Sequence, residues 1–252
     1  MRELETEVKR AGSAAAKPAA PCPVPIAAAG LSLGVVIPAL NEEDLVGRAV
    51  ESCWKAGARE VIVADGGSTD GTPKAAAAAG AIVLPAPRGR PAQMNAGACL
   101  STADVLIFLH ADACLPRAAG DEIRAVLADP EVGGGAFRLR VDAPSFYFRA
   151  LSTIARARAY WWRTVFGDQG IFARRELFEK IGGYRDLPIL EDFDFVKRLR
   201  RKARFRLLRG EVRSSVRRWR KKGKFRTSLI NWSILFLYQT GADPVRLAKW
   251  YR

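Results

Sequence analysis

The sequence predicts an α/β fold with a mostly parallel, Rossmann-like sheet flanked by helices, and three observations support this prediction. Short apolar strands alternate with helix-forming segments along the chain. Two of these strands, at 61–65 and 105–109, end beside polar residues, as strands do where an open sheet meets its ligand. The 252 residues, 49% of them apolar, are enough for one sizeable domain with its own core.

The first half of the chain carries the clearest alternation. Residues 1–30 are rich in Ala, Pro and charge and cannot bury enough apolar area to order themselves, so we expect an N-terminal tail. A strand is expected at 31–40, and a polar turn and an acid-rich helix start lead into a helix at 45–56. A second strand, a helix and a third strand are then expected at 61–65, 73–79 and 81–84.

The fourth strand, Val105 to Leu109, is apolar throughout and is followed by His110 and Asp112. A carboxylate two positions from an imidazole, at the carboxyl end of a core strand, is a candidate metal or phosphate site. The alternative is a strand end that turns on an aspartate without binding anything. This strand alone does not distinguish the two interpretations, and the motifs in the rest of the chain are needed to do so.

The second half is less regular. Segment 145–166 interleaves aromatic residues with arginines, which fits either an amphipathic helix packed on the sheet or a surface for a lipid or sugar. The regular elements expected around it are a helix at 120–128, strands at 133–140 and near 170–172, and helices at 174–181 and 187–202.

The net charge of +15 is concentrated in one segment, because residues 197–226 hold sixteen Lys and Arg against one acid. This indicates a local anionic partner. The four cysteines, Cys22, Cys53, Cys99 and Cys114, show no CxxC spacing, so the sequence indicates neither a zinc site nor a disulfide framework and fits a reducing, cytoplasmic setting. We expect neither a secretory signal nor a membrane-spanning segment.

Several separated motifs together resemble the family 2 glycosyltransferases, which have the nucleotide-sugar-binding GT-A fold. The resemblance covers about residues 31–225. Its motifs, in chain order, are VVIPALNEE (35–43), VADGGSTDGT (63–72), LHADACLP (109–116), FGDQGIF (166–172), LEDFDF (190–195) and RRW (217–219). The resemblance implies an inverting transferase that takes a sugar from a nucleoside diphosphate sugar.

The resemblance also implies a metal, Mg²⁺ or Mn²⁺, which neutralises the diphosphate leaving group. Asp112 matches the second acid of the family's Asp-x-Asp motif, but His110 stands where the first acid is expected. Imidazole is a poor ligand for Mg²⁺ and an acceptable one for Mn²⁺. His110 can therefore bind metal, orient Asp112 or contact the sugar, and the identity of the metal stays open.

The donor site implied by the resemblance draws on several loops. Asp65 matches the acid that accepts a hydrogen bond from a ring N–H of the base. Arginines suit the diphosphate because the guanidinium fork binds phosphate oxygens in pairs. The predicted donor-binding residues are Pro38, Ala39, Asn41, Glu42, Asp65, Arg88, Arg90, Gln93, Asp112, Arg218 and Trp219.

The catalytic prediction falls on Asp192, which resembles the general base of inverting members. Displacement at the anomeric carbon needs the acceptor to lose a proton as it attacks, and a carboxylate facing the sugar can take it. Glu191 and Asp168 would orient the acceptor or the base. Glu191 and Asp192 also fit the first turn of a helix, where acids are favoured for the helix dipole alone.

Residues 31–225 are thus the predicted catalytic domain, and 226–252 a C-terminal amphipathic helical segment. A basic stretch beside an apolar helix suggests peripheral contact with the anionic inner face of the cell membrane. We therefore expect an acceptor that is lipid-linked or otherwise amphipathic, such as a carotenoid acid, a polyprenyl or a polysaccharide intermediate. The helix could instead fold back on the domain, leaving the charges solvated or facing the donor.

The sequence also bears on two other function classes. A nucleic-acid-binding protein would explain the basic segment but not the acids at the strand ends, so we do not expect nucleic acid as the partner. A nicotinamide-dependent dehydrogenase lacks support because no GxGxxG follows the first strand.

Overall fold

The fold was obtained as a computed structural model, which describes residues 30–141, 153, 165, 167–215, 233–234, 236–238 and 240–251. The predicted tail and nearly all of the aromatic-basic segment 145–166 lie outside the described residues, as do Arg218 and Trp219.

The described residues build one sheet in the order β3-β2-β1-β4-β7-β6-β8-β5. β1, β2, β3 and β4 pair in parallel, as do β6 and β8, whereas β7 is antiparallel to both of its neighbours and β5 to β8. The strands are β1 (Leu33–Ala39), β2 (Glu60–Asp65), β3 (Ile82–Pro85), β4 (Val105–Phe108), β5 (Ala113–Cys114), β6 (Val132–Val141), β7 (Ile171–Arg174) and β8 (Arg204–Ser214). The predicted mostly parallel sheet is confirmed.

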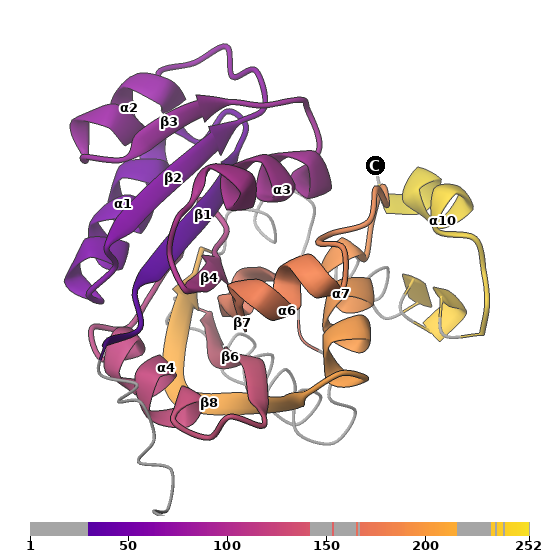
Figure 1. Cartoon of the computed structure of the whole chain (residues 1–252). Coiled ribbons are helices and arrows are strands. Elements are labelled where there is room, and N and C mark those ends of the chain that lie inside the picture. The colour runs from indigo at the N-terminus through magenta and orange to yellow at the C-terminus, as the bar shows by residue number, and fades with distance from the viewer. Residues whose placement is uncertain are drawn as a thin grey trace, which may run out of the picture.

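Helices cover both faces of this sheet (Figure 1). One apolar core lies between the sheet and α1 (Glu43–Lys55), α2 (Thr72–Ala78) and α4 (Ala119–Leu127). The second core lies beneath α3 (Arg90–Leu100), α6 (Arg175–Lys180) and α7 (Glu191–Arg200). β1 and β4 are buried along their whole length because they lie between the two cores, which is why they read as continuous apolar runs.

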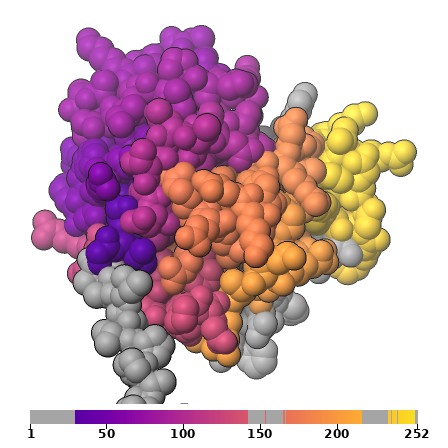
Figure 2. Space-filling view, viewed as in Figure 1, coloured from indigo at the N-terminus to yellow at the C-terminus, as the bar shows by residue number. Residues whose placement is uncertain are grey.

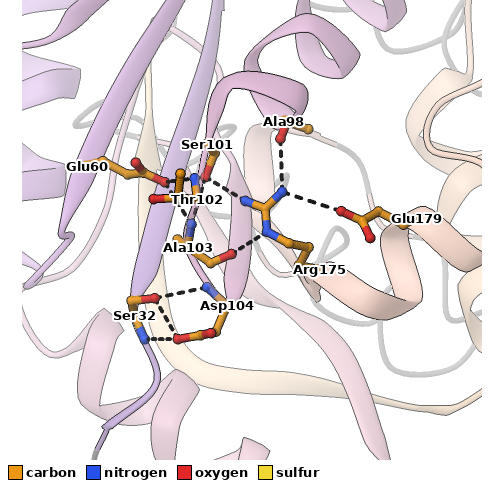
Figure 3. A network of polar contacts seen from close by, with 9 residues as sticks. All are labelled: Ser32, Glu60, Ala98, Ser101, Thr102, Ala103, Asp104, Arg175 and Glu179. Carbon is orange, nitrogen blue, oxygen red and sulfur yellow. Dashed lines mark hydrogen bonds and ion pairs between the residues drawn. The ribbon is translucent and has the colours of Figure 1, made fainter.

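A polar network fixes the edge of the sheet opposite to the carboxyl ends of these parallel strands (Figure 3). The Glu60 carboxylate accepts hydrogen bonds from the backbone of Thr102 and Ala103, so the start of β2 holds the turn that leads into β4. Arg175 donates to the carbonyls of Ala98 and Ala103, at 3.1 and 2.6 Å. This half-buried guanidinium therefore joins α6 to the end of α3.

β8 is the longest element that the sequence did not predict. It occupies eleven residues of the basic segment and pairs with β6 along most of its length. Its arginines point outward while Leu208 and Val212 enter the core, so part of the +15 segment is a structural strand.

The described part of the C-terminal segment folds back on the domain. Ile234 and Leu247, the latter in α10 (Pro244–Tyr251), form a small apolar cluster with Ile189, which precedes α7. The segment lies beside α7, away from α1 and α2 (Figures 1 and 2). Among the described residues, no helix is both long and apolar enough to cross a bilayer.

Candidate active site

The carboxyl ends of β1, β2 and β4 meet at one edge of the sheet, where the sequence placed most of the predicted site. Ala39, the last residue of β1, lies beside Asp65, the last residue of β2. Asp65 is 8% exposed, and one carboxylate oxygen accepts backbone hydrogen bonds from Gly67 and Ser68, at 3.1 and 3.0 Å. Asp65 thus shapes the loop that follows β2.

Asn41 joins that loop to the end of β1. Its backbone is left-handed, with φ of 56°, a conformation that asparagine tolerates better than most residues. Its side-chain oxygen accepts from the backbone N–H of Thr69 at 2.9 Å, and its own N–H donates to the Ser68 hydroxyl at 3.0 Å. The N–H of Glu42 donates to the Thr72 hydroxyl at 2.7 Å. The two predicted donor loops are therefore held together by hydrogen bonds.

Gln93 has a structural contact that the sequence did not suggest. It is 4% exposed, and its side-chain nitrogen donates to the carbonyls of Ala39 and Ala64 at 2.8 and 2.7 Å. The amide thus bridges the carboxyl ends of β1 and β2 from α3. Its predicted contact with the donor diphosphate stays a prediction.

The antiparallel strand β7 brings three distant motifs together. Phe108 lies opposite Ile171, so the residues after β4 lie beside those before β7, in the 3₁₀ turn η2 (Gly167–Gln169). There the Gly167 N–H donates to Asp192 Oδ2 at 2.9 Å, and His110 Nε2 lies 3.8 Å from the same oxygen. His110 and Asp192 are 82 positions apart in the chain, and the sheet topology alone makes them neighbours.

Gly167 is required at this point because there is no room for a side chain. A Cβ added to it would lie 2.4 Å from His110 Nε2 and 2.6 Å from Asp192 Oδ2, well inside van der Waals contact. In the sequence Gly167 stands out only as part of the FGDQGIF motif, and nothing there indicates its role.

Asp192 is 4% exposed, and its protonation is set by its surroundings. Burial, together with the negative charge of Glu191, raises the pKa of Asp192 to about 8, while the Arg90 guanidinium and the Gly167 N–H oppose this increase. Its second oxygen, Oδ1, is buried and makes no hydrogen bond with the described residues. One oxygen is therefore held in place by a hydrogen bond, and the other has no hydrogen bond to the described residues.

The neighbours of Asp192 include two other predicted residues. Glu191 is 5% exposed, and its carboxylate lies 3.5 Å from Arg90 Nη1, which places the start of α3 beside the start of α7. Asp168 lies in η2, and its charge also raises the pKa of Asp192. Leu190, directly before them, has a left-handed φ of 62°, a strained conformation of the kind that collects at functional sites.

Tyr184 was missed by the sequence analysis. It is 3% exposed, its ring stacks on Phe195 with 4.4 Å between centroids, and its hydroxyl makes no hydrogen bond with the described residues. Burial and the carboxylates of Asp192 and Glu191 raise the pKa of Tyr184, so its hydroxyl stays protonated beside them. In the sequence Tyr184 is a single tyrosine after a Gly-Gly pair, and nothing in this pattern indicates that its side chain lies beside Asp192 and Glu191.

Asp112 follows the carboxyl end of β4, four residues after Phe108. Within the ranges that the structure describes, no three His, Cys, Asp or Glu side chains gather closely enough to hold a metal ion. This fits an ion such as Mg²⁺, which proteins often bind through one or two carboxylates together with substrate phosphates. His110 Nε2 faces Asp192, so ligation through this nitrogen would replace that contact.

The structure therefore brings His110, Asp168, Glu191, Asp192 and Arg90 together. Arg88 is exposed in the loop before α3. Arg218 and Trp219 lie outside the described residues, so their donor contacts remain predictions.

The profile of the family described as "Glycosyl transferase family 2" matches residues 34–182, more than half of the chain. The chain belongs to glycosyl transferase family 2. The match spans the motifs that contain Asp65, Asp112 and Asp168, whereas Asp192 lies ten residues beyond it. The resemblance seen in the sequence is confirmed, and this family 2 protein is a glycosyltransferase.

Solved structures of other proteins share this fold. The mannosyltransferase PcManGT from Pyrobaculum calidifontis, solved with GDP-Man and Mn²⁺, is 20% identical, with a TM-score of 0.61 over 88% of this chain and 69% of that one. A mycobacterial protein is 22% identical, with a TM-score of 0.53 over 75% of this chain and 67% of that one. Comparison with curated protein sequences finds no match. These likenesses confirm the GT-A fold.

Proposed function

We propose that this glycosyltransferase moves a sugar, with inversion, from a nucleoside diphosphate sugar to a hydroxyl or carboxyl group of its acceptor. The observation that carries the proposal is the buried Asp192, held at Oδ2 by the Gly167 N–H and without a hydrogen bond to the described residues at Oδ1. The family 2 match over residues 34–182 ends ten residues before Asp192. PcManGT, a protein of the same fold, was solved with GDP-Man.

In this proposal Asp192 acts as the general base. The acceptor oxygen attacks the anomeric carbon while Oδ1 takes its proton, and the bond from that carbon to the diphosphate breaks with its electron pair on the phosphate oxygen. An acceptor bound as a carboxylate needs no proton transfer. Glu191 and its partner Arg90 hold the start of α7, and Asp168, in η2, would orient the acceptor.

The donor would lie over the carboxyl ends of β1 and β2. Pro38, Ala39, Asn41 and Glu42 form one side of this edge, and Asp65 the other, with Gln93 holding the strands together. Arg88, Arg90, Arg218 and Trp219 complete the proposed donor set.

A divalent ion, Mg²⁺ or Mn²⁺, would be held by Asp112 together with the donor's phosphates, with His110 as a further candidate ligand. When bound, such an ion stabilises the charge that develops on the leaving diphosphate. Because the described residues offer no group of three ligands, we expect the ion to bind together with the donor and only weakly without it.

We further propose that the acceptor is amphipathic and that the enzyme contacts the inner face of the cell membrane from the cytoplasm. Three large apolar side chains of the C-terminal segment, Phe236, Val245 and Trp250, are 57% to 67% exposed although Ile234 and Leu247 pack on the domain. The basic residues of 216–226 adjoin this segment in the chain. Exposed aromatic residues near basic ones favour an anionic membrane surface.

Calorimetry with UDP and with GDP, each with and without Mn²⁺, tests the donor proposal. We expect one of the two nucleotides to bind, more tightly when Mn²⁺ is present, and the Asp112→Asn variant to lose that metal dependence. If neither nucleotide binds in the presence of Mn²⁺ or Mg²⁺, the proposal is wrong. Cosedimentation with phosphatidylglycerol vesicles, comparing the Phe236→Ser, Trp250→Ser double variant with the wild type, tests membrane contact separately.

A further inference from the structure

A cleft lined by arginines opens beside Asp112, on the side formed by α1, β5, β6 and β8. Its volume is about 820 Å³, within the range of small-molecule sites. Its charged lining consists of Arg48, Arg117, Arg140, Arg209, Arg213, Asp112 and Glu211. We call it the arginine cleft. With five guanidiniums against two carboxylates, it has an excess of positive charge.

The arginines of this cleft are poorly neutralised by the protein itself. The Arg140 guanidinium pairs with Glu211 at 3.4 Å. Arg48, Arg117, Arg209 and Arg213 form no ion pair with a carboxylate within the part of the chain that the structure describes. Elsewhere on β8 the pattern differs, because Arg204 pairs with Glu131 at 2.7 Å.

The strand register also places like charges next to one another. Arg140 of β6 and Arg213 of β8 are direct neighbours across the two parallel strands. Adjacent strands lie about 4.7–4.9 Å apart, and like charges facing each other at this distance repel. Arg209 and Arg213 both lie outward on β8. An anion bound between such side chains would offset the repulsion.

The cleft side chains converge from separate elements. Arg48 of α1 and Arg213 of β8 both act electrostatically on the thiol of Cys114, as does Asp112. The Cys114 thiol also lies 3.8 Å from the Arg48 carbonyl. Leu45, Leu115 and Pro116 provide an apolar part of the lining. A group with a compact negative charge and an apolar part would match both kinds of surface.

We propose that the arginine cleft binds a phosphate group of a ligand other than the sugar-nucleotide donor. Arginine is suited to this because its planar fork binds phosphate oxygens in pairs. The inference rests on the proposed function only in suggesting that the phosphate belongs to the acceptor or to a membrane lipid. Phosphate binding itself can be measured without any transfer.

The full-length protein is titrated with inorganic phosphate by calorimetry, first alone and then with the bound nucleoside diphosphate and Mg²⁺ present. We expect phosphate to bind in both cases, and Arg140→Ala and Arg213→Ala each to weaken it by about tenfold, as for the loss of one charge-assisted hydrogen bond. Arg206→Ala is the matched control, because Arg206 is an exposed arginine of the same strand that lies by Asp129, 3.8 Å away. It should leave phosphate binding unchanged.

Vesicles distinguish the two sources of the phosphate. Phosphatidylcholine vesicles with and without phosphatidylglycerol are sedimented with the same variants. If Arg213→Ala loses binding to the phosphatidylglycerol vesicles and Arg206→Ala does not, the cleft binds a lipid headgroup. If Arg213→Ala binds these vesicles as the wild type does but binds inorganic phosphate more weakly, the cleft binds a soluble phosphorylated ligand. The proposal is overturned if phosphate does not bind, if Arg206→Ala weakens it equally, or if the nucleoside diphosphate displaces it. A failure of nucleotide binding alone would count against the proposed function and not against this site.

Discussion

Replacing Gly167 by alanine should disable the proposed base while leaving the donor site intact. The added Cβ would lie 2.4 Å from His110 Nε2 and 2.6 Å from Asp192 Oδ2, so one or both side chains must move by about 1 Å to restore van der Waals contact. A displacement of this size at a catalytic group can lower the rate by about 10²-fold. The overpacking should also lower the free energy of unfolding by about 1–3 kcal/mol.

The assay compares kcat for sugar transfer and nucleoside diphosphate affinity in Gly167→Ala and in Gly47→Ala. Gly47 lies in α1, and the nearest atom to an added Cβ is a backbone oxygen 3.9 Å away, so this control should keep its activity and gain about 0.5–1 kcal/mol of stability. If Gly167→Ala remains folded and transfers sugar at the wild-type rate, Asp192 is not the base in the arrangement described.

Two further predictions concern pH and the packing of α6. Because burial and Glu191 raise the pKa of Asp192 to about 8, kcat/KM should rise with pH and level off above about 8. The same shift means that the folded state holds this proton more tightly than the unfolded state does. The contribution of this proton to the free energy of unfolding is therefore full at low pH and is lost as pH rises toward 8. Arg175→Ala removes the hydrogen bonds to the carbonyls of Ala98 and Ala103 and should cost about 2 kcal/mol, lowering Tm by about 4–8 °C in a calorimetric scan.

A different result would contradict each of these two predictions. A pH profile of kcat/KM that is flat from neutral to alkaline pH would remove the buried carboxylate from the proton transfer. An unchanged Tm for Arg175→Ala would show that water replaces the guanidinium without cost. Arg201→Ala, at the exposed end of α7, is the control for the loss of one positive charge.

The sequence predicted the first half of the fold well because its physical signals are local. β1, β2 and β4 lie near their expected ranges, since apolar runs buried on both faces have few other interpretations. Their carboxyl ends gave the predicted positions of Asp65 and Asp112. The helix that carries Asp192 was also expected, although it begins at Glu191 and not at Leu187.

β8 was missed for an identifiable reason. Its outward positions carry Arg204, Arg206, Arg209 and Arg213, so a count of charges identified a basic segment before an alternating strand could be seen. The register shift of β6 against β8 after Ala136 also breaks the two-residue period. A periodicity test applied to 204–214 without regard to net charge could have found it.

The pairing of His110 with Asp192 could not be predicted from local patterns. It depends on β7 running antiparallel beside β4, which sets η2 next to the end of β4. Neither the length nor the composition of residues 141–166 fixes that direction. The sequence therefore identified the candidate residues without showing which of them touch.

The Asp192→Asn variant tests the central claim most directly. Asparagine keeps the size of the side chain and an oxygen to accept the Gly167 N–H, but it cannot take a proton at neutral pH. With the protein's own donor and a hydroxyl acceptor, the account predicts unchanged nucleoside diphosphate affinity by calorimetry and a fall in kcat of about 10²–10⁴-fold. Transfer at the wild-type rate by a folded, donor-binding Asp192→Asn protein would contradict it.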